Sequence, residues 1–206
     1  MSLSKKLDYS TLFELSDPMA IEPFRLRSRL PSDSSQGGLD LDRLSQGAIQ
    51  VSDPIQFDVA QGSGIYDFLW TQLVTPVCIS KRVVRLLQKS DVSGWSTYPV
   101  EVIDDKGRLL ADYHGLAVSG AICLANYTRS SVVTKSPPAP RGRSYDVYRG
   151  LYFDADEWDG SDMFWVGRVR VVVEKVKKIF EQNDVKNVCF TRLSEREIRV
   201  RHVQGN

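Results

Sequence analysis

Residues 80–98 read Ser-Lys-Arg-Val-Val-Arg-Leu-Leu-Gln-Lys-Ser-Asp-Val-Ser-Gly-Trp-Ser-Thr-Tyr and contain a helix start, a helix, a turn and a strand. Ser80 is a favoured N-cap, because its side-chain oxygen can accept a free backbone N–H of the first helical turn. Valine and leucine recur at helical spacing over residues 83–87 with basic residues between them, which predicts an amphipathic helix of about ten residues. Gly94 then marks a turn, and a strand is expected over 98–103.

The same order of features returns 93 residues later, where residues 174–191 read Glu-Lys-Val-Lys-Lys-Ile-Phe-Glu-Gln-Asn-Asp-Val-Lys-Asn-Val-Cys-Phe-Thr. The pair Asp-Val occupies the same place in both stretches, but Val173 stands where Ser80 caps the first helix. Either any helix-turn-strand segment has this pattern, or the chain holds two related units in one sheet. We predict an α+β fold, with a mainly antiparallel sheet and two principal helices in two candidate repeats of a helix-turn-strand unit.

The composition is that of an ordinary globular protein, with 206 residues, 42% hydrophobic residues, 26% charged residues and a net charge of +1. The balanced charge makes a surface that coats nucleic acid unexpected, so no direct nucleic-acid partner is predicted. No stretch has the pattern of a signal peptide or of a membrane-spanning helix. The three cysteines lie far apart without CxxC spacing, which favours buried reduced thiols and a cytoplasmic location.

Polar residues, glycines and prolines dominate residues 1–50, so we expect a partly mobile N-terminal segment there, most mobile over 28–38. Residues 51–206 are expected to form a single α+β domain. Further along, the patterns predict a strand after Pro54, a short helix over 65–73, one long strand over 109–124 and an exposed loop over the proline- and arginine-rich residues 128–147.

The densest acidic run precedes an apolar stretch and contains Asp154, Asp156, Glu157, Trp158, Asp159 and Asp162. As a calcium loop it fails, because the fifth position counted from Asp154 is a tryptophan and the sixth is not glycine. One interpretation is a solvated turn anchored in the core by Trp158. The other is a partner-facing patch, since preorganised charges speed the encounter with a basic protein. A second, smaller acidic turn with the same two interpretations contains Glu101, Asp104 and Asp105.

Catalytic signals are weak in this sequence. His114 and His202 are the only histidines, and nothing in the pattern brings them together. No phosphate-binding glycine loop, dinucleotide fingerprint or HExxH zinc motif occurs. We therefore predict no catalytic residue, no metal ligand and no cofactor.

A family resemblance rests on three stretches, which begin at Pro76, Val92 and Tyr152. They read Pro-Val-Cys-Ile-Ser-Lys-Arg-Val-Val-Arg-Leu-Leu, Val-Ser-Gly-Trp-Ser-Thr-Tyr-Pro-Val-Glu-Val and Tyr-Phe-Asp-Ala-Asp-Glu-Trp-Asp-Gly-Ser-Asp-Met-Phe, and Asp184-Val185 and Cys189-Phe190 follow the last one. Over about residues 70–195 the chain resembles a family of immunity proteins from bacterial polymorphic toxin systems. The resemblance rests on apolar and turn positions, not on a catalytic signature.

The resemblance implies a cytoplasmic, non-enzymatic protein that binds and neutralises a cognate toxin domain by occlusion, and the two acidic groups are then the predicted toxin-binding residues. Two alternatives stay open. The chain could be a metal-dependent hydrolase that uses the acidic loop 154–162, or a structural or ligand-sensing module.

Overall fold

The structure is a computed structural model that describes residues 7–18, 24–29, 39–62, 64, 66–72 and 76–200. Its N-terminal elements are η1 (Tyr9–Thr11), β1 (Leu12–Ser16), β2 (Arg25–Ser28), α1 (Leu41–Ser45), β3 (Ile55–Gln61), β4 (Phe68–Thr71), β5 (Val77–Ser80), α2 (Lys81–Lys89), β6 (Trp95–Ile103), β7 (Leu109–Leu110) and β8 (Tyr113–Val118). The C-terminal elements are β9 (Ile122–Cys123), β10 (Ser131–Lys135), β11 (Tyr145–Arg149), η3 (Ala155–Glu157), β12 (Met163–Val166), β13 (Val169–Val173), α3 (Glu174–Gln182), β14 (Cys189–Arg192), η4 (Leu193–Glu195) and β15 (Glu197–Arg199).

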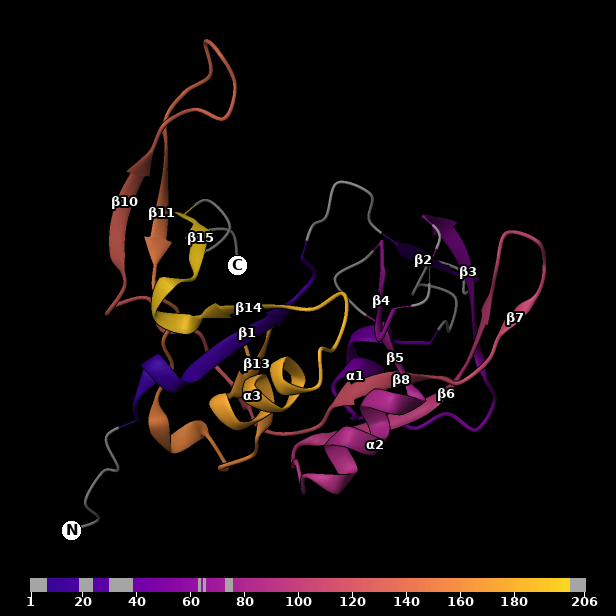
Figure 1. The fold of residues 1–206 in the computed structure, drawn as a ribbon. Helices are drawn as coiled ribbons and strands as arrows, with labels where there is room; N and C mark the ends of the chain where they lie inside the picture. The colour runs from indigo at the N-terminus through magenta and orange to yellow at the C-terminus, as the bar shows by residue number, and fades with distance from the viewer. Residues whose placement is uncertain are drawn as a thin grey trace.

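The strands form three sheets (Figure 1). In the first, the order β3-β2-β4-β5-β8-β6 closes into a barrel because β3 also pairs with β6, and β7 extends β6 as a hairpin. The second has the order β14-β1-β13-β12-β9, and the third is the small sheet β10-β11-β15. The fold is α+β, with strands predominating. The first two sheets are mixed, however, because β2–β4, β3–β6 and β9–β12 pair in parallel, and the third is antiparallel, so the predicted antiparallel arrangement holds only in part.

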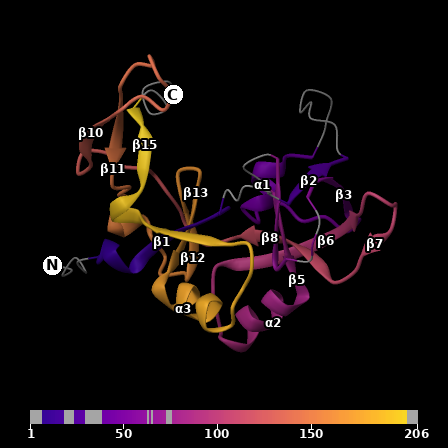
Figure 2. The same ribbon diagram turned by 45° about the horizontal axis from the view of Figure 1, so that its top comes forward.

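Two structurally equivalent units make up most of the molecule. In the first unit, hairpin β4–β5 leads through α2 to β6, and β8 lies between β5 and β6. In the second unit, hairpin β12–β13 leads through α3 to β14, and β1 lies between β13 and β14. The two helices lie side by side in both views (Figures 1 and 2). The sequence repeat therefore corresponds to a repeat in topology. The middle strand differs in its place in the chain: β8 follows the other strands of its unit, whereas β1 precedes them.

The repeated Asp-Val pair ends each helix in the same way. Asp91 and Asp184 both adopt the left-handed conformation, with φ of 45° and 50°. The next backbone N–H groups, of Val92 and Val185, then bond back to the last helical turn at 3.1 and 3.0 Å. This closure satisfies carbonyl groups that a helix end leaves free. Ser80 caps α2 as predicted, with its hydroxyl oxygen 3.3 Å from the N–H of Val83. Val173 supplies no side-chain cap for α3.

Both units bury their helices in one shared apolar core. Val83 and Leu87 of α2 and Val176 and Phe180 of α3 belong to the same cluster of buried side chains. Strands of both sheets complete it, through residues that include Phe68, Trp70, Ile79, Leu116, Met163, Trp165 and Val172. Because the two faces bury each other, removing either unit would expose a large apolar surface to water.

Polar contacts between the units follow the same two-fold pattern. Arg82, at the start of α2, donates to the Asn183 carbonyl at the end of α3, at 2.8 Å. Lys175, which occupies the equivalent position at the start of α3, donates to the Asp91 carbonyl at the end of α2, at 2.9 Å. The basic side chain at the start of each helix thus binds a carbonyl at the end of the other helix. A positive charge is stabilising there, because the helix dipole is negative at its C-terminus.

Several expectations from the sequence need correction. Residues 12–16, 25–28 and 41–45, within the polar N-terminal segment, form β1, β2 and α1, and β1 is an inner strand of its sheet. The region 65–73, expected to be a helix, contains strand β4. Its aromatic residues Phe68 and Trp70 are buried within the β4–β5 hairpin and do not line one helix face. The long strand expected over 109–124 is divided into β7, β8 and β9.

The predicted loop over 128–147 is largely a hairpin. The β-branched run Ser131–Lys135 pairs with Tyr145–Arg149, and the prolines are confined to the tip between the strands. Of the other sequence predictions, residues 30–38 of the expected mobile stretch 28–38 and His202 lie outside the described residues. Within the described part of the chain, no helix is long and apolar enough to cross a membrane.

Candidate protein-binding surface

The predicted acidic loop is an ordered turn held by its tryptophan. Residues 155–157 form the short helix η3, and Trp158 follows it, half-buried. The indole ring lies 5.4 Å from the ring of Phe164, and its Nε1 donates to the Ser161 carbonyl at 3.0 Å. Trp158 is therefore a core anchor, and it fixes the position of the carboxylates on either side of it.

Two of these carboxylates bind the backbone nearby. Glu157 Oε2 accepts the N–H of Leu124 at 2.6 Å, and Asp159 accepts the N–H and the hydroxyl of Ser161 at 2.9 and 2.6 Å. The hydrogen bond from the Ser161 side chain is the main cause that holds the pKa of Asp159 below its usual value. Asp159 is thus charged at neutral pH, and hydrogen bonds hold both side chains in place.

The acidic loop lies along β9, the edge of the five-stranded sheet. Strand β9 corresponds to β2 in the other unit, because both run parallel to the aromatic strand of their hairpin. The equivalence extends to single bonds, since Gly167 N bonds to Cys123 O at 2.9 Å and Gln72 N bonds to Leu26 O at 3.0 Å. In the first unit β3 covers the outer edge of β2. In the second unit the Glu157 carboxylate takes a backbone N–H at that edge instead, which protects it from pairing.

Because a carboxylate and not a strand covers the edge of β9, two large apolar side chains remain on the surface beside the acidic loop. Leu124 is 72% exposed and Ile122 is 53% exposed. The buried Cys123 lies between them, and burial, reinforced by the charges of Glu157 and Asp159, raises its pKa to about 11. We call this surface the acidic–apolar patch; it consists of Ile122, Leu124, Asp154, Asp156, Glu157 and Asp159.

Asp162 has a different role from the rest of the acidic run. Its side chain is only 17% exposed and turns toward the first unit. It accepts the backbone N–H of Ser93 at 2.9 Å and pairs with Lys175 at 3.0 Å. Asp162 therefore joins the two units and does not belong to the acidic–apolar patch.

The second predicted acidic group, Glu101, Asp104 and Asp105, lies at the β6–β7 hairpin of the barrel, away from the β9 sheet (Figure 1). Glu101 accepts from the Gln56 side chain at 2.8 Å. Asp104 caps the turn, and the backbone N–H of Arg108 is the main cause that lowers its pKa. Asp105 is exposed at the tip, next to a turn that ends at the 61%-exposed Leu109. The two acidic groups, for which the sequence left the same two interpretations open, thus lie on different parts of the molecule.

No metal centre emerges among the described residues, since no three of their His, Cys, Asp and Glu side chains gather in a way that could hold an ion. The acidic run instead directs its carboxylates to backbone N–H groups, a hydroxyl and a lysine. His114 lies in β8, opposite Pro99.

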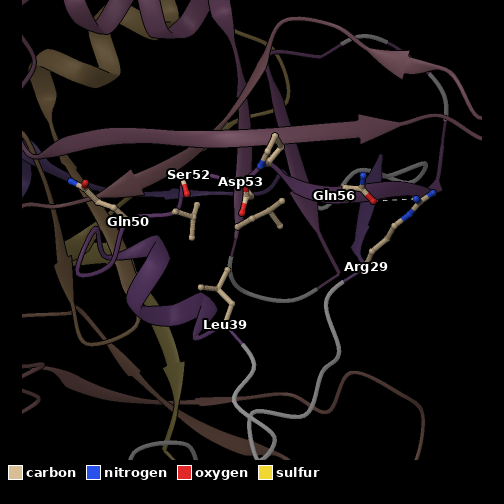
Figure 3. A pocket seen from close by; sticks show the side chains of 9 residues that line it. Arg29, Leu39, Gln50, Ser52, Asp53 and Gln56 are labelled. Carbon is tan, nitrogen blue, oxygen red and sulfur yellow. Dashed lines mark hydrogen bonds between the residues drawn. The ribbon is translucent and has the colours of Figure 1, made fainter.

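Two surface hollows contain none of the predicted site residues. The larger, of about 600 Å³, lies beside β3; Arg29 spans from its rim to Gln56 and to Asp58, so its guanidinium is already bonded (Figure 3). The smaller, of about 380 Å³, lies between the units and is lined in part by Arg170. Burial lowers the pKa of Arg170 to about 10, and its guanidinium lies 5.0 Å from the ring of Trp165.

Sequence reasoning missed Ile122 and Leu124 as surface residues, because they appeared as the apolar end of one long strand. No protein-family model matches this chain, and a search of curated proteins found no match either.

Proposed function

We propose that this protein binds and neutralises a toxin domain in the bacterial cytoplasm, by covering the toxin's basic working surface with the acidic–apolar patch. The carrying observation is that Ile122 and Leu124 are exposed within a rim of fixed carboxylates. An apolar centre with a charged rim is the usual anatomy of a protein–protein interface. The resemblance of residues 70–195 to immunity proteins supports the same proposal.

The physical roles within the patch differ. Leu124 and Ile122 would supply apolar area that is removed from water on binding, at about 25 cal/mol per Å² of buried surface. Asp154 and Asp156 are exposed and would attract a basic partner and orient it during the encounter. Glu157 and Asp159 keep the turn in place through their backbone bonds. Occlusion of this kind requires a rigid surface but no catalytic residue.

A charge-and-size variant tests the patch directly. We expect Leu124→Ala combined with Asp156→Lys to weaken binding to the candidate toxin domain, taken from the protein encoded next to this gene, by at least ~10-fold, as truncation of an interface anchor typically does. Calorimetric titration of the purified domain would measure this change. Because neither side chain has a buried partner among the described residues, the melting temperature should stay the same.

The β6–β7 hairpin offers a matched control. Leu109→Ala combined with Asp105→Lys makes the same two changes on an exposed leucine and an exposed aspartate. This control should keep wild-type affinity. Loss of binding in the control, with the patch variant unaffected, would move the interface to the barrel hairpin and contradict the proposal.

A further inference from the structure

Strand β10 is an open sheet edge on a part of the molecule that stands away from the body. Among the described residues it pairs only with β11, while β15 forms the other edge of that small sheet. Both views show the β10–β11 hairpin extending beyond the two units, with β10 on its outer side (Figures 1 and 2). With five residues it is the longest strand at a sheet edge in the part of the chain that the structure describes.

The β10 edge lacks the usual protections against pairing. Its sequence, Ser-Val-Val-Thr-Lys, favours strand structure and contains no proline or bulge. Its one charge, on Lys135, is engaged by Glu197 at 2.8 Å. Val132 is 60% exposed. An edge of this kind is a template for strand addition.

The strand is also self-complementary. If β10 pairs antiparallel with β10 of a second copy, centred on Val133, then Val132 faces Thr134 of the second copy and Ser131 faces Lys135. This register places no like charges opposite each other, and the two contacts of each kind are related by a two-fold axis, as in isologous dimers.

The hairpin tip adds complementary charge. Arg141 and Arg143 are exposed on the tip, and neither forms an ion pair among the described residues. The tip spans residues 136–144 and can reach roughly 15 Å beyond the strand at about 3.3 Å per residue. In the antiparallel register the tip of one copy extends past the base of the other copy's hairpin. That base is tied to the acidic loop, because Asn126 pairs with Tyr152 and its side chain lies 3.4 Å from Asp154.

We propose that the chain forms a homodimer by antiparallel pairing of β10 with β10 of a second copy, with Arg141 and Arg143 of each tip on Asp154 and Asp156 of the other copy. This dimer does not depend on the proposed function, because it involves this chain alone. The tips would cover the acidic–apolar patch, so dimer formation and toxin binding at that patch would exclude each other.

Analytical ultracentrifugation of the purified chain over a concentration series tests the dimer. We expect a monomer–dimer equilibrium and slower amide exchange of Ser131–Lys135 in the dimer than in the dilute monomer. Arg141→Glu with Arg143→Glu should weaken the dimer by at least ~10-fold, and adding Asp154→Lys with Asp156→Lys should restore it by exchanging the charges. Arg85→Glu with Lys89→Glu, on the exposed face of α2, is a control with the same change in charge and should have no effect.

Two results would overturn the proposal. One is a chain that stays monomeric over the whole concentration series. The other is a dimer that is insensitive to the tip reversal and leaves Ser131–Lys135 unprotected, because the copies would then meet elsewhere. Either result would leave the toxin-binding titrations unaffected, so a failure of the dimer is distinguishable from a failure of the proposed function.

Discussion

Replacing Asp67 with alanine is expected to lower the free energy of unfolding by about 1–3 kcal/mol, the typical cost of leaving hydrogen-bond donors without a buried acceptor. The Asp67 carboxylate is almost fully buried between the two units. It pairs with Arg82 and accepts the Ser80 hydroxyl at 2.8 Å and the backbone N–H of Lys186 at 2.9 Å. Removing it leaves these donors without their acceptor. Urea-induced unfolding would measure the loss.

The equivalent position in the other unit provides the comparison. Asp162 binds the N–H of Ser93 and Lys175, as Asp67 binds Lys186 and Arg82, but it is more exposed. Asp162→Ala should therefore cost less than Asp67→Ala, since solvent screens the more exposed of the two carboxylates. Equal costs for the two variants would contradict the view that burial sets the difference.

The contribution of Asp67 should depend on pH. Burial alone would raise its pKa, but hydrogen bonds from Arg82, the Lys186 backbone and Ser80 hold the pKa below its usual value of 3.8. A carboxyl group with a lowered pKa in the folded state stabilises the fold above the unfolded pKa, and this stability is lost as the pH falls below it. The stability gap between wild type and Asp67→Asn should thus narrow below pH 3.8. A stability gap that stays constant down to about pH 2 would contradict this assignment.

Gly94→Ala is expected to destabilise the protein by about 2–5 kcal/mol, through a strained backbone together with a steric clash. Gly94 adopts φ of 78°, and a Cβ atom there would lie 2.1 Å from the backbone carbonyl oxygen of Met163. That oxygen is part of the hairpin of the other unit and cannot move away independently. Thermal unfolding monitored by circular dichroism would measure the effect.

Gly107 separates the two causes. It has φ of 76°, close to that of Gly94, but a Cβ atom there would meet nothing within 4 Å. Gly107→Ala should therefore show only the cost of the left-handed conformation, about 1–2 kcal/mol. If both variants lost the same stability, the close approach of the two units at Gly94 would be without energetic consequence.

Local signals predicted the repeated elements well. The Ser80 cap and the apolar spacing located α2, and the Asp-Val pairs marked helix ends that both adopt the left-handed conformation. The sequence could not show that β1 lies between β13 and β14, because that pairing joins residues over 150 positions apart and leaves no local pattern. The hairpin of β10 and β11 was hidden for a different reason, because the prolines of its tip favour a loop over the whole stretch.

The candidate site was predictable in composition but not in geometry. The acidic residues were identified, and Trp158 is the anchor that one interpretation required. Their roles depend on tertiary contacts: Asp162 turns toward Ser93, whereas Glu157 covers the edge of β9. Leu124 is exposed because the second sheet, as far as the structure describes the chain, has no strand equivalent to β3, and no single stretch of sequence reveals this difference.

The most direct test of the central claim is a growth-rescue experiment. The protein encoded next to this gene would be the candidate toxin, and its C-terminal domain would be expressed in bacteria alone, with the wild-type chain, and with the Leu124→Ala and Asp156→Lys double variant. The account predicts growth arrest by the domain alone, rescue and co-purification with the wild-type chain, and reduced rescue with the folded variant. Arrest that the wild-type chain leaves unchanged, with no complex recovered, would contradict a neutralising function.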